Sequence, residues 1–462
     1  MQKKNLRGVL GITSCLGLIL PDATAQSDQS VPPNVLVIVL DDAGYNDFGF
    51  MGCQDIPTPN IDQLASSGMV FSDGHVSASV SGPSRAGILT GRYQQRNGYE
   101  CNLEEILGLG LEEETMADIF KKNGYTTYCV GKWHQGAGEA YHPNKRGFEH
   151  FYGFIAGARS YFYRPKADDK PSNTKALQYN GTIMPFTKYL TYELGDKAVE
   201  YINNQPDNRP FMMYLCFNAV HTPLEATDED LALFQGHQRQ KLAAMTFAVD
   251  KAIGRIVDKL SEEGKLQNTL IFFLSDNGGA HNNMSSNYPL KGFKGNKYEG
   301  GIRVPFFVKY GNRFQGQFAN LVSSLDILPT AMSVAGIPIS TTKKPLDGVN
   351  LLPYLQNKVN GNPHEKLFWR KEGMAAMRMG EYKLIRAEGV GERLYNLKDD
   401  LGEIQDLSSL QPDVLKQMMK DLKQWETGLI NPPLWNEGPW TEVTKEIHRK
   451  LMNNQSVNKY SP

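Results

Sequence analysis

Asn34-Val35-Leu36-Val37-Ile38-Val39-Leu40-Asp41-Asp42 contains an unbroken apolar run, rich in β-branched residues, which two aspartates end abruptly. A strand buried on both faces of a sheet has this pattern, because neither face then carries polar side chains. Two later runs share it. They are Pro210 to Phe217, which ends near Asn218 and His221, and Thr269 to Leu274, which leads into Ser275-Asp276-Asn277-Gly278-Gly279.

Shorter strand candidates and helical patterns lie between these runs. The shorter strands are Thr126 to Val130, ahead of Gly131-Lys132-Trp133-His134, and Arg303 to Lys309. Three stretches place apolar residues three and four positions apart, which is typical of helices: Met116 to Lys122, Leu194 to Asn203 and Leu242 to Glu263. This alternation predicts an α/β fold, with a large and mostly parallel sheet flanked by helices.

Polar residues follow the predicted strands at the point where each strand ends. In sheets of this kind, residues just beyond the carboxyl ends of the strands line the binding crevice. Four of the runs deliver Asp, Asn, His or Lys to that edge. Buried strands have no structural need for so many polar terminators, so the pattern predicts a functional site there.

The sequence changes in character from about Leu346 onward. Four short strand-like segments, separated by turns, lie between Leu367 and Leu397, and a helix is expected from about Pro412 to Trp425. This predicts a small antiparallel sheet with one packed helix. We therefore expect a catalytic domain over residues 26–345 and a C-terminal subdomain over 346–462, whose last ten residues form a polar tail.

The first 25 residues are typical of an export signal. Lys3, Lys4 and Arg7 precede a mostly apolar stretch, and Ala23-Thr24-Ala25 offers a cleavage site. Export, most simply to the periplasm, is therefore expected. A lipid anchor at Cys15 is the less favoured alternative, because the apolar stretch continues past that residue. No later segment has the long apolar run of a membrane-spanning helix.

Charge and cysteine content exclude several classes of protein. The 49 basic and 50 acidic residues give a net charge of −1, so no global field indicates nucleic acid as a partner. An anionic substrate would have to be held by local charges. Cys53, Cys101, Cys129 and Cys216 are widely spaced, which argues against a zinc knuckle, and buried thiols are favoured over a disulfide.

Asp41, Asp42, Asp276 and Asn277 form an oxygen-only set at two predicted strand ends. Hard divalent cations take carboxylate and amide oxygens, so Ca²⁺ is expected here, with Mg²⁺ as the alternative. Each pair alone is also typical of an ordinary turn. Three carboxylates packed together would repel one another unless a cation neutralised them, which favours a metal site.

Ser81-Gly82-Pro83-Ser84-Arg85-Ala86-Gly87-Ile88-Leu89-Thr90-Gly91 resembles the signature of the type I sulfatases, members of the alkaline phosphatase superfamily. Gly124 to His134 resembles the second signature of that family. Asn218-Ala219-Val220-His221-Thr222-Pro223 and the segment around Lys294 are similar to two further family elements. The resemblance extends from Asn34 to about Trp425.

The resemblance implies a role for each matching residue. Ser81 would be the precursor of formylglycine, the aldehyde nucleophile of the family. Asp41, Asp42, Asp276, Asn277 and the modified residue 81 would hold calcium. Arg85 and Lys132 would stabilise the hydrated aldehyde, and Lys132 and Lys294 would bind sulfate oxygens. His134 would assist the release of sulfate, and His221 would protonate the leaving alcohol.

The physical logic of sulfate ester hydrolysis agrees with these roles. The reaction needs charge neutralised on sulfate, a strong nucleophile and a proton for the departing oxygen. Arg85 lies four residues after Ser81, so on a helix both side chains share one face. Position 81 is Ser rather than Cys, and in the family the Ser form is associated with bacterial, oxygen-independent radical maturation by a partner enzyme.

Three function classes follow from the sequence. The leading one is a sulfatase that removes sulfate from the end of a galactose- or hexosamine-type sugar. The others are a phosphatase or phosphodiesterase that uses unmodified Ser81 with two metals, and a sulfoglycan-binding protein without turnover. Aromatic and basic residues alternate between Gly136 and Tyr179. They suit a sulfated sugar, or equally the packing of a loop.

Overall fold

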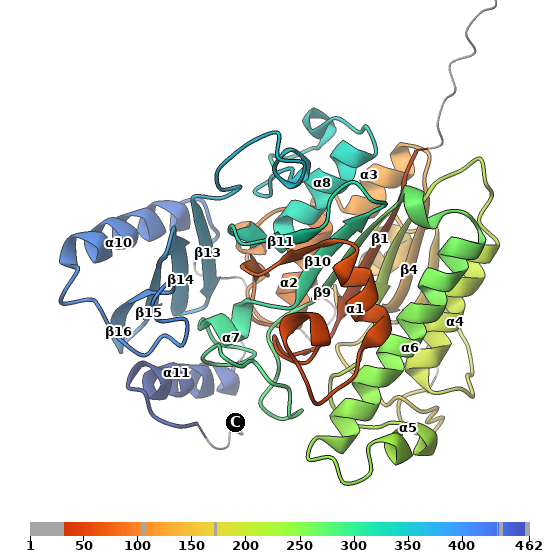
Figure 1. Cartoon of the computed structure of the whole chain (residues 1–462), viewed down its shortest axis with the longest axis horizontal. Helices are drawn as coiled ribbons and strands as arrows, with labels where there is room; N and C mark the ends of the chain where they lie inside the picture. The colour runs from red at the N-terminus through yellow and green to blue at the C-terminus, as the bar shows by residue number, and fades with distance from the viewer. Residues whose placement is uncertain (1–31, 103–106, 171–172, 432, 434–437, 458–462) are drawn as a thin grey trace, which may run out of the picture. The chain divides into compact units, whose positions relative to one another are not determined.

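The apolar run at the start of the chain forms strand β1 (Asn34–Leu40), which lies near the centre of a large sheet (Figure 1). The computed structural model describes residues 32–102, 107–170, 173–431, 433 and 438–457, and every element named below belongs to one unit, residues 32–462. The predicted export signal lies outside the described residues. Among the described residues, no helix is long and apolar enough to cross a membrane.

Ten strands of the described chain form the large sheet, in the order β11-β2-β10-β9-β1-β8-β4-β5-β6-β7. Their bounds are Gly316–Phe318, Met69–Phe71, Phe306–Tyr310, Thr269–Ser275, Asn34–Leu40, Phe211–Cys216, Thr126–Lys132, His150–Phe154, Gln178–Tyr179 and Thr182–Ile183, in that order. The central strands β9, β1, β8, β4 and β5 are all parallel, whereas β10 runs antiparallel to β9 and to β2. The predicted α/β fold is confirmed, as is its mostly parallel sheet.

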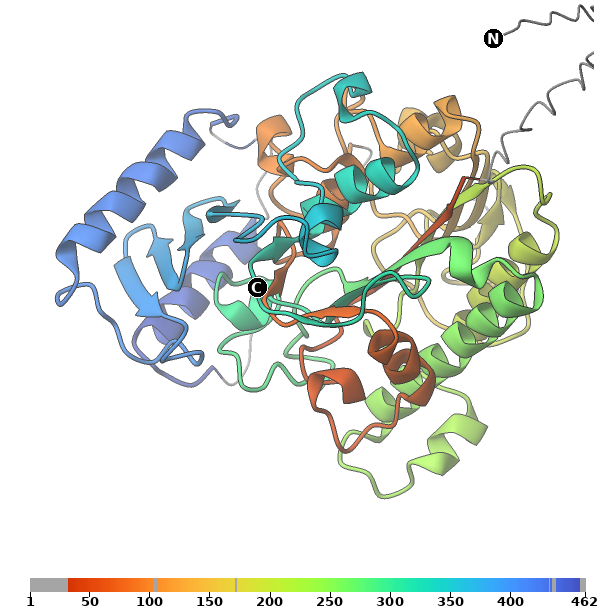
Figure 2. The same ribbon diagram turned by 45° about the horizontal axis from the view of Figure 1, so that its top comes forward.

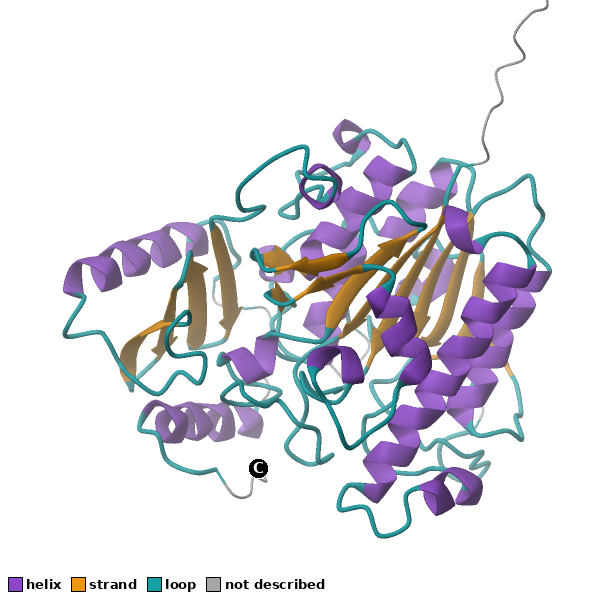
Figure 3. Ribbon diagram, viewed as in Figure 1, coloured by secondary structure: helices purple, strands orange, loops and turns teal. Residues whose placement is uncertain are grey.

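Helices cover both faces of this sheet because its central strands are apolar on both sides. Leu36, Ile38 and Leu40 of β1 point into one core. There they pack with α1 (Pro59–Ser66), α4 (Leu190–Asn203) and α6 (Gln240–Glu262). The alternate residues Val35, Val37 and Val39 point into a second core. That core includes α2 (Ser81–Thr90), α3 (Met116–Lys122) and α8 (Ile327–Val334) (Figure 3).

One predicted strand in this sheet is shorter than expected. The segment from Arg303 to Lys309 pairs as β10 only from Phe306 onward. Pro305 has no N–H to contribute to the ladder, so the strand begins after it. Smaller elements complete this part of the chain: β3 (Gly74–His75) paired with β12 (Val322–Ser323), α5 (Asp228–Leu233), α7 (Glu299–Ile302) and α9 (Leu352–Leu355).

The C-terminal sheet is antiparallel, as predicted, with the order β13-β14-β15-β16. Its strands are Lys366–Lys371, Met374–Met379, Tyr382–Ala387 and Gly391–Asn396. Helix α10 (Pro412–Glu426) covers one face (Figure 2). A second helix, α11 (Pro439–Met452), packs on the other face and was not predicted. The expectation of one packed helix is therefore wrong, and residues 458–462 of the predicted tail lie outside the described residues.

A buried ionic cluster lies between the α7 segment and the C-terminal sheet. Lys383 of β15 places its ammonium 2.8 Å from Glu299 Oε1 and 2.9 Å from Glu403 Oε1. Glu299 also contacts His75 at 2.9 Å, and Asp73 contacts Arg303 and Arg378. Asp73, His75 and Glu299 have the spacing of a metal site, and Lys383, Arg303 and Arg378 lie against their carboxylates.

Candidate active site

The polar ends of the central strands meet at one edge of the large sheet. Asp41 and Asp42 follow β1, and Asp276 and Asn277 follow β9, its parallel neighbour, in which Ser275 pairs with Leu40. The N–H of Asp42 donates to Asp276 Oδ1 at 3.3 Å. The four side chains are almost completely buried, between 0% and 2% exposed. The structure therefore brings together the oxygen-only set that the sequence predicted.

Helix α2 places Ser81 at its first position and is buried along its whole length. Pro83 fits the first turn, where an N–H has no partner within the helix. The N–H of Gly82 donates to Asn102 Oδ1 at 2.9 Å. At the other end, Gly91 adopts a φ of 63° and donates its N–H to Gly87, which is the usual way for a helix to end.

The Ser81 hydroxyl faces the oxygens of both strand ends. Its Oγ lies 3.1 Å from Asp41 Oδ1 and 3.2 Å from Asn277 Oδ1. A hydroxyl has one proton and satisfies only one of these two acceptors. A divalent cation shared by the three oxygens would satisfy them all, so this donor set fits the hard metal that the sequence predicted.

A second grouping of possible metal ligands includes a histidine. Asp41, Asp42 and His221 each offer one ligand atom, and these atoms lie within 4.8 Å of one another. Calcium and magnesium prefer oxygen ligands to imidazole nitrogen. Because Ser81, Asp41 and Asn277 already supply converging oxygens, His221 is not needed as a ligand.

Three cations neutralise the three buried carboxylates. Arg85 donates from Nε to Asp276 Oδ2 at 2.8 Å, and Lys132 Nζ lies 2.6 Å from Asp41 Oδ2. Lys294 Nζ lies 2.7 Å and 2.8 Å from the two oxygens of Asp42. Each cation comes from a different element of the chain: α2, the end of β4 and the loop before α7.

These contacts decide the charge state of the aspartates. Burial alone would raise the pKa of Asp41, but the Lys132 ammonium holds it below its ordinary value. Burial would likewise raise the pKa of Asp42, and the Lys294 ammonium holds it low. Both carboxylates are therefore charged at neutral pH, as metal ligands have to be.

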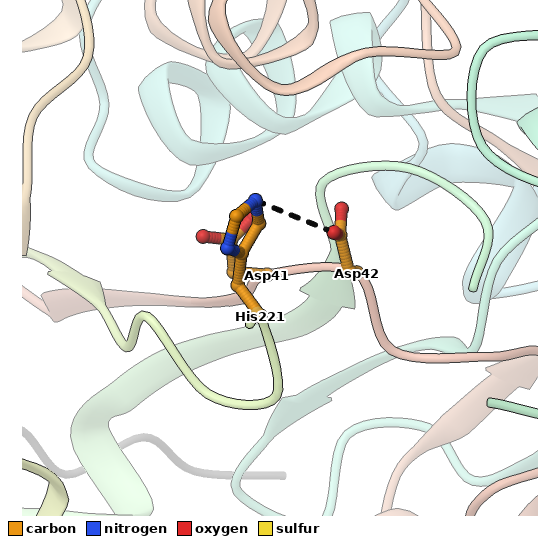
Figure 4. Close-up of side chains that lie close together, drawn as sticks. All are labelled: Asp41, Asp42 and His221. Carbon is orange, nitrogen blue, oxygen red and sulfur yellow. Dashed lines mark ion pairs between the residues drawn. The ribbon is translucent and has the colours of Figure 1, made fainter. Parts of the chain in front are cut away.

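His221 lies beside Asp41 and Asp42, as Figure 4 shows. Its Nε2 is 3.6 Å from Asp42 Oδ2, and its Nδ1 is 2.7 Å from the carbonyl oxygen of Thr222. A carbonyl only accepts hydrogen bonds, so Nδ1 carries a proton. The other nitrogen, Nε2, then carries a proton to give up only when both ring nitrogens are protonated.

His134 is buried, and its Nδ1 has no hydrogen-bond partner among the described residues. Burial, together with the nearby cations Lys132 and Arg85, holds the pKa of His134 well below its ordinary value. The ring is therefore neutral at physiological pH. Gly157 packs against the ring and leaves no room for a side chain, since a Cβ at this position would lie 2.7 Å from the His134 ring.

A cavity of about 250 Å³ opens onto these side chains. Its lining includes five residues that the sequence predicted: Ser81, Lys132, His134, His221 and Lys294. Arg85 lies behind them, fully buried. Five of the predicted residues thus line one cavity, and Arg85 is buried behind them.

The alternating aromatic and basic residues between Gly136 and Tyr179 mostly pack inside the protein. Five are buried: Arg146, Phe148, Tyr152, Arg159 and Tyr161. The Tyr161 hydroxyl lies 2.6 Å from the carbonyl oxygen of Asn218 and 2.8 Å from that of His221, and so supports the His221 loop. Of the two interpretations that the sequence left open, these five residues follow the packing of a loop rather than a sugar-binding face.

Sequence reasoning missed several residues that support the site. Asn283 donates to the backbone oxygens of Asp42 and Val220, and Asn102 holds the start of α2. Lys297, close to Lys294, donates to Ser79 Oγ at 2.9 Å, and its N–H donates to His448 of α11. These residues come from loops and from an unpredicted helix, where no periodic pattern indicates them.

Comparison with known proteins finds related sequences. A family model described as Sulfatase matches residues 33–337. The uncharacterized sulfatase YdeN of Escherichia coli strain K12 is 31% identical over 393 residues, which cover 73% of this chain and 68% of that protein. Human N-acetylgalactosamine-6-sulfatase is 30% identical over 385 residues, which cover 76% and 71%.

A solved structure resembles the whole described fold. It is the crystal structure of Ps i-CgsB in complex with k-i-k-neocarrahexaose. The two structures superpose with a TM-score of 0.82 at 35% sequence identity, and the match covers 90% of this chain and 97% of that chain. The resemblance therefore includes the C-terminal sheet as well as the large one.

Proposed function

This chain belongs to the sulfatase family of the alkaline phosphatase superfamily, and we propose that it hydrolyses sulfated carbohydrates through formylglycine at position 81 and a calcium ion. Its relatives are sulfuric ester hydrolases. The observation that carries the proposal is the position of Ser81. Its Oγ lies at the start of α2, on the floor of the cavity, among oxygens from two strand ends.

Residue 81 and the metal set would act together. Asp41, Asp42, Asp276, Asn277 and an oxygen of the modified residue would hold the ion. When present, the hydrated aldehyde supplies a nucleophilic hydroxyl and the calcium ion withdraws charge from it. A maturation enzyme would have to supply the oxidation, which removes two hydrogen atoms from Ser81.

The cations of the site would bind and polarise the sulfate group. Lys132 and Lys294 line the cavity. The ammonium group of Lys132 contacts the carboxylate of Asp41, and that of Lys294 contacts the carboxylate of Asp42. Such preorganised charges stabilise the charge that develops on the sulfate oxygens. Arg85 is held by Asp276 and adds a positive charge behind residue 81.

The two histidines would have opposite proton roles. His221 as an imidazolium donates its Nε2 proton to the departing alcohol, while Nδ1 stays hydrogen-bonded to Thr222. His134 is neutral and so keeps one ring nitrogen without a proton, to which we assign the role of assisting the release of sulfate from residue 81. One acid and one base therefore lie on the wall of the same cavity.

The cavity favours a substrate of one sugar unit. Small-molecule sites typically occupy about 300–1,000 Å³, and this cavity, at about 250 Å³, lies just below that range. One relative is named for N-acetylgalactosamine, and Ps i-CgsB has been crystallised with k-i-k-neocarrahexaose. We therefore propose removal of sulfate from a galactose- or hexosamine-type unit at the end of a glycan.

The proposal is tested by mass spectrometry of the peptide that contains residue 81, isolated from the native host, together with assays of sulfate release. We expect a side chain that has lost two hydrogen atoms, and activity that chelation abolishes and Ca²⁺ restores. Active protein with an unmodified serine at position 81 would overturn the nucleophile. Activity on phosphate esters alone would favour the phosphatase class instead.

A further inference from the structure

The wall of the cavity carries a third lysine, Lys175, which the reaction does not use. The ammonium groups of Lys132 and Lys294 are held by aspartates at 2.6–2.8 Å. Among the residues that the structure describes, Lys175 has only Asp168 within ion-pair distance, at 3.9 Å. Its side chain is 46% exposed. Its charge is therefore available to a ligand in the cavity.

The backbone of Lys175, in contrast, is firmly held. The preceding carbonyl, of Thr174, accepts the N–H groups of Ile155 and Ala156, which follow β5 and also line the cavity. The Lys175 carbonyl accepts a hydrogen bond from Arg159 at 2.7 Å. Its own N–H donates to Asn173 Oδ1 at 3.0 Å.

Arg159 is the buried support of this arrangement. It is 2% exposed, its guanidinium contacts Asp169 at 2.9 Å, and it stacks on the ring of Phe186 at 4.8 Å. The base of the Lys175 side chain is thus fixed on the cavity wall while the ammonium remains uncommitted. An ordinary surface lysine has neither this support nor a position on a cavity.

We propose that Lys175 binds a second anionic group, a sulfate ester or a carboxylate, on the sugar that loses its sulfate. The inference rests on the proposed function and deepens it by naming the substrate class, a saccharide with at least two negative charges. With a net charge of −1 the protein has no overall field to attract such a ligand. Recognition of the second charge therefore needs a local cation such as Lys175.

The test measures binding to the unmatured serine form, which allows equilibrium measurements without turnover. Calorimetry in the presence of Ca²⁺ compares a monosulfated and a disulfated sugar, in both the galactose and the N-acetylgalactosamine series. We expect the wild-type protein to bind the disulfated sugar about fivefold more tightly, the upper end for an exposed ion pair. In Lys175→Gln that preference disappears, whereas affinity for the monosulfated sugar is unchanged.

Two matched variants complete the design. Lys175→Arg keeps the charge and retains the preference. Lys166→Gln removes an exposed lysine of the same loop that does not line the cavity, and it also retains the preference. Equal affinity for the two sugars in wild type, or an unchanged preference in Lys175→Gln, would overturn the inference. Failure of the proposed function would show separately, as matured enzyme that releases no sulfate.

Discussion

The two ring nitrogens of His221 have different surroundings, so only one of them is available to a substrate. Nδ1 is bound to the Thr222 carbonyl, so only Nε2 is left to serve a substrate in the cavity. A proton donor matters most when the departing alcohol is a poor leaving group. Alkyl sulfates therefore depend on His221 more strongly than sulfates of activated phenols do.

We predict that His221→Ala lowers kcat by about a hundredfold or more for a sugar sulfate, but by much less for 4-nitrophenyl sulfate. Steady-state kinetics on both substrates check this. Tyr161→Phe serves as the comparison, because it loosens the same loop by removing the hydroxyl that donates to the His221 carbonyl. Equal losses on the two substrates in His221→Ala would contradict the proton-donor role.

Ser81 and Ser84 lie on the same buried helix but differ in surroundings. Ser81 faces Asp41 and Asn277, whereas the Ser84 hydroxyl has no partner among the described residues. We predict that Ser81→Ala reduces sulfate release by at least about a thousandfold, with an unchanged melting temperature. Ser84→Ala keeps most of the activity. Comparable losses in both variants would mean that α2 tolerates no substitution and that Ser81 has no special role.

Most individual site residues were predictable, and the reason is chemical. Asp41, Asp276 and Lys132 end strands, so their positions follow from the pattern of the strands. Asn283 and Lys175 were not predictable, because they lie in loops: Asn283 holds two backbone oxygens, and Lys175 lines the cavity. Tyr161 takes one of the two roles that the sequence left open, because an aromatic residue beside basic ones is equally typical of a sugar-binding face and of a packed loop.

Helix α2 depends on the absence of a side chain at Gly82. A Cβ there would lie 2.4 Å from the hydroxyl of Tyr99. We predict that Gly82→Ala destabilises the protein by about 1–3 kcal/mol, the usual cost of overpacking, and lowers activity by shifting Ser81. Adding Tyr99→Phe removes the clashing oxygen and restores part of both. Denaturant unfolding measures the effect, and no recovery in the double variant would contradict this explanation.

The helices and strands with the clearest patterns of apolar residues were the ones that the sequence predicted best. β1 and α3 have the bounds that the sequence predicted, and β9 extends by one residue. α11 was missed although Val443, Ile447, Leu451 and Met452 have helical spacing. Its apolar residues are few among many charged ones, and they pack on the C-terminal sheet, which supplies most of the stability of such a helix.

The ionic cluster that joins the α7 segment to the C-terminal sheet makes stability depend on pH. Burial raises the pKa of Glu403 to about 7, from an ordinary value of 4.5. The folded protein therefore binds this proton more tightly than the unfolded chain does. The contribution of this proton to the free energy of unfolding is complete below pH 4.5 and is lost as the pH rises toward about 7.

We predict that Glu403→Gln flattens the fall in stability between pH 4.5 and about 7 by roughly 1–3 kcal/mol. Urea unfolding at several pH values measures it. Glu381→Gln, at an exposed glutamate in the turn between β14 and β15, is the matched control and leaves the slope unchanged. A wild-type protein whose stability does not fall over this pH range would contradict the assignment.

The burial of α2 imposes an order of events on the biosynthesis of the protein. Once the chain has folded, Ser81 is 1% exposed and its helix is packed against α8, which is synthesised much later. No other protein can then bind the peptide around residue 81. For the formylglycine that we propose at residue 81, an oxidising enzyme would therefore have to reach this serine before the chain has folded. Molecules that folded first would keep an ordinary hydroxyl, so under this proposal the active fraction would report the relative rates of modification and folding.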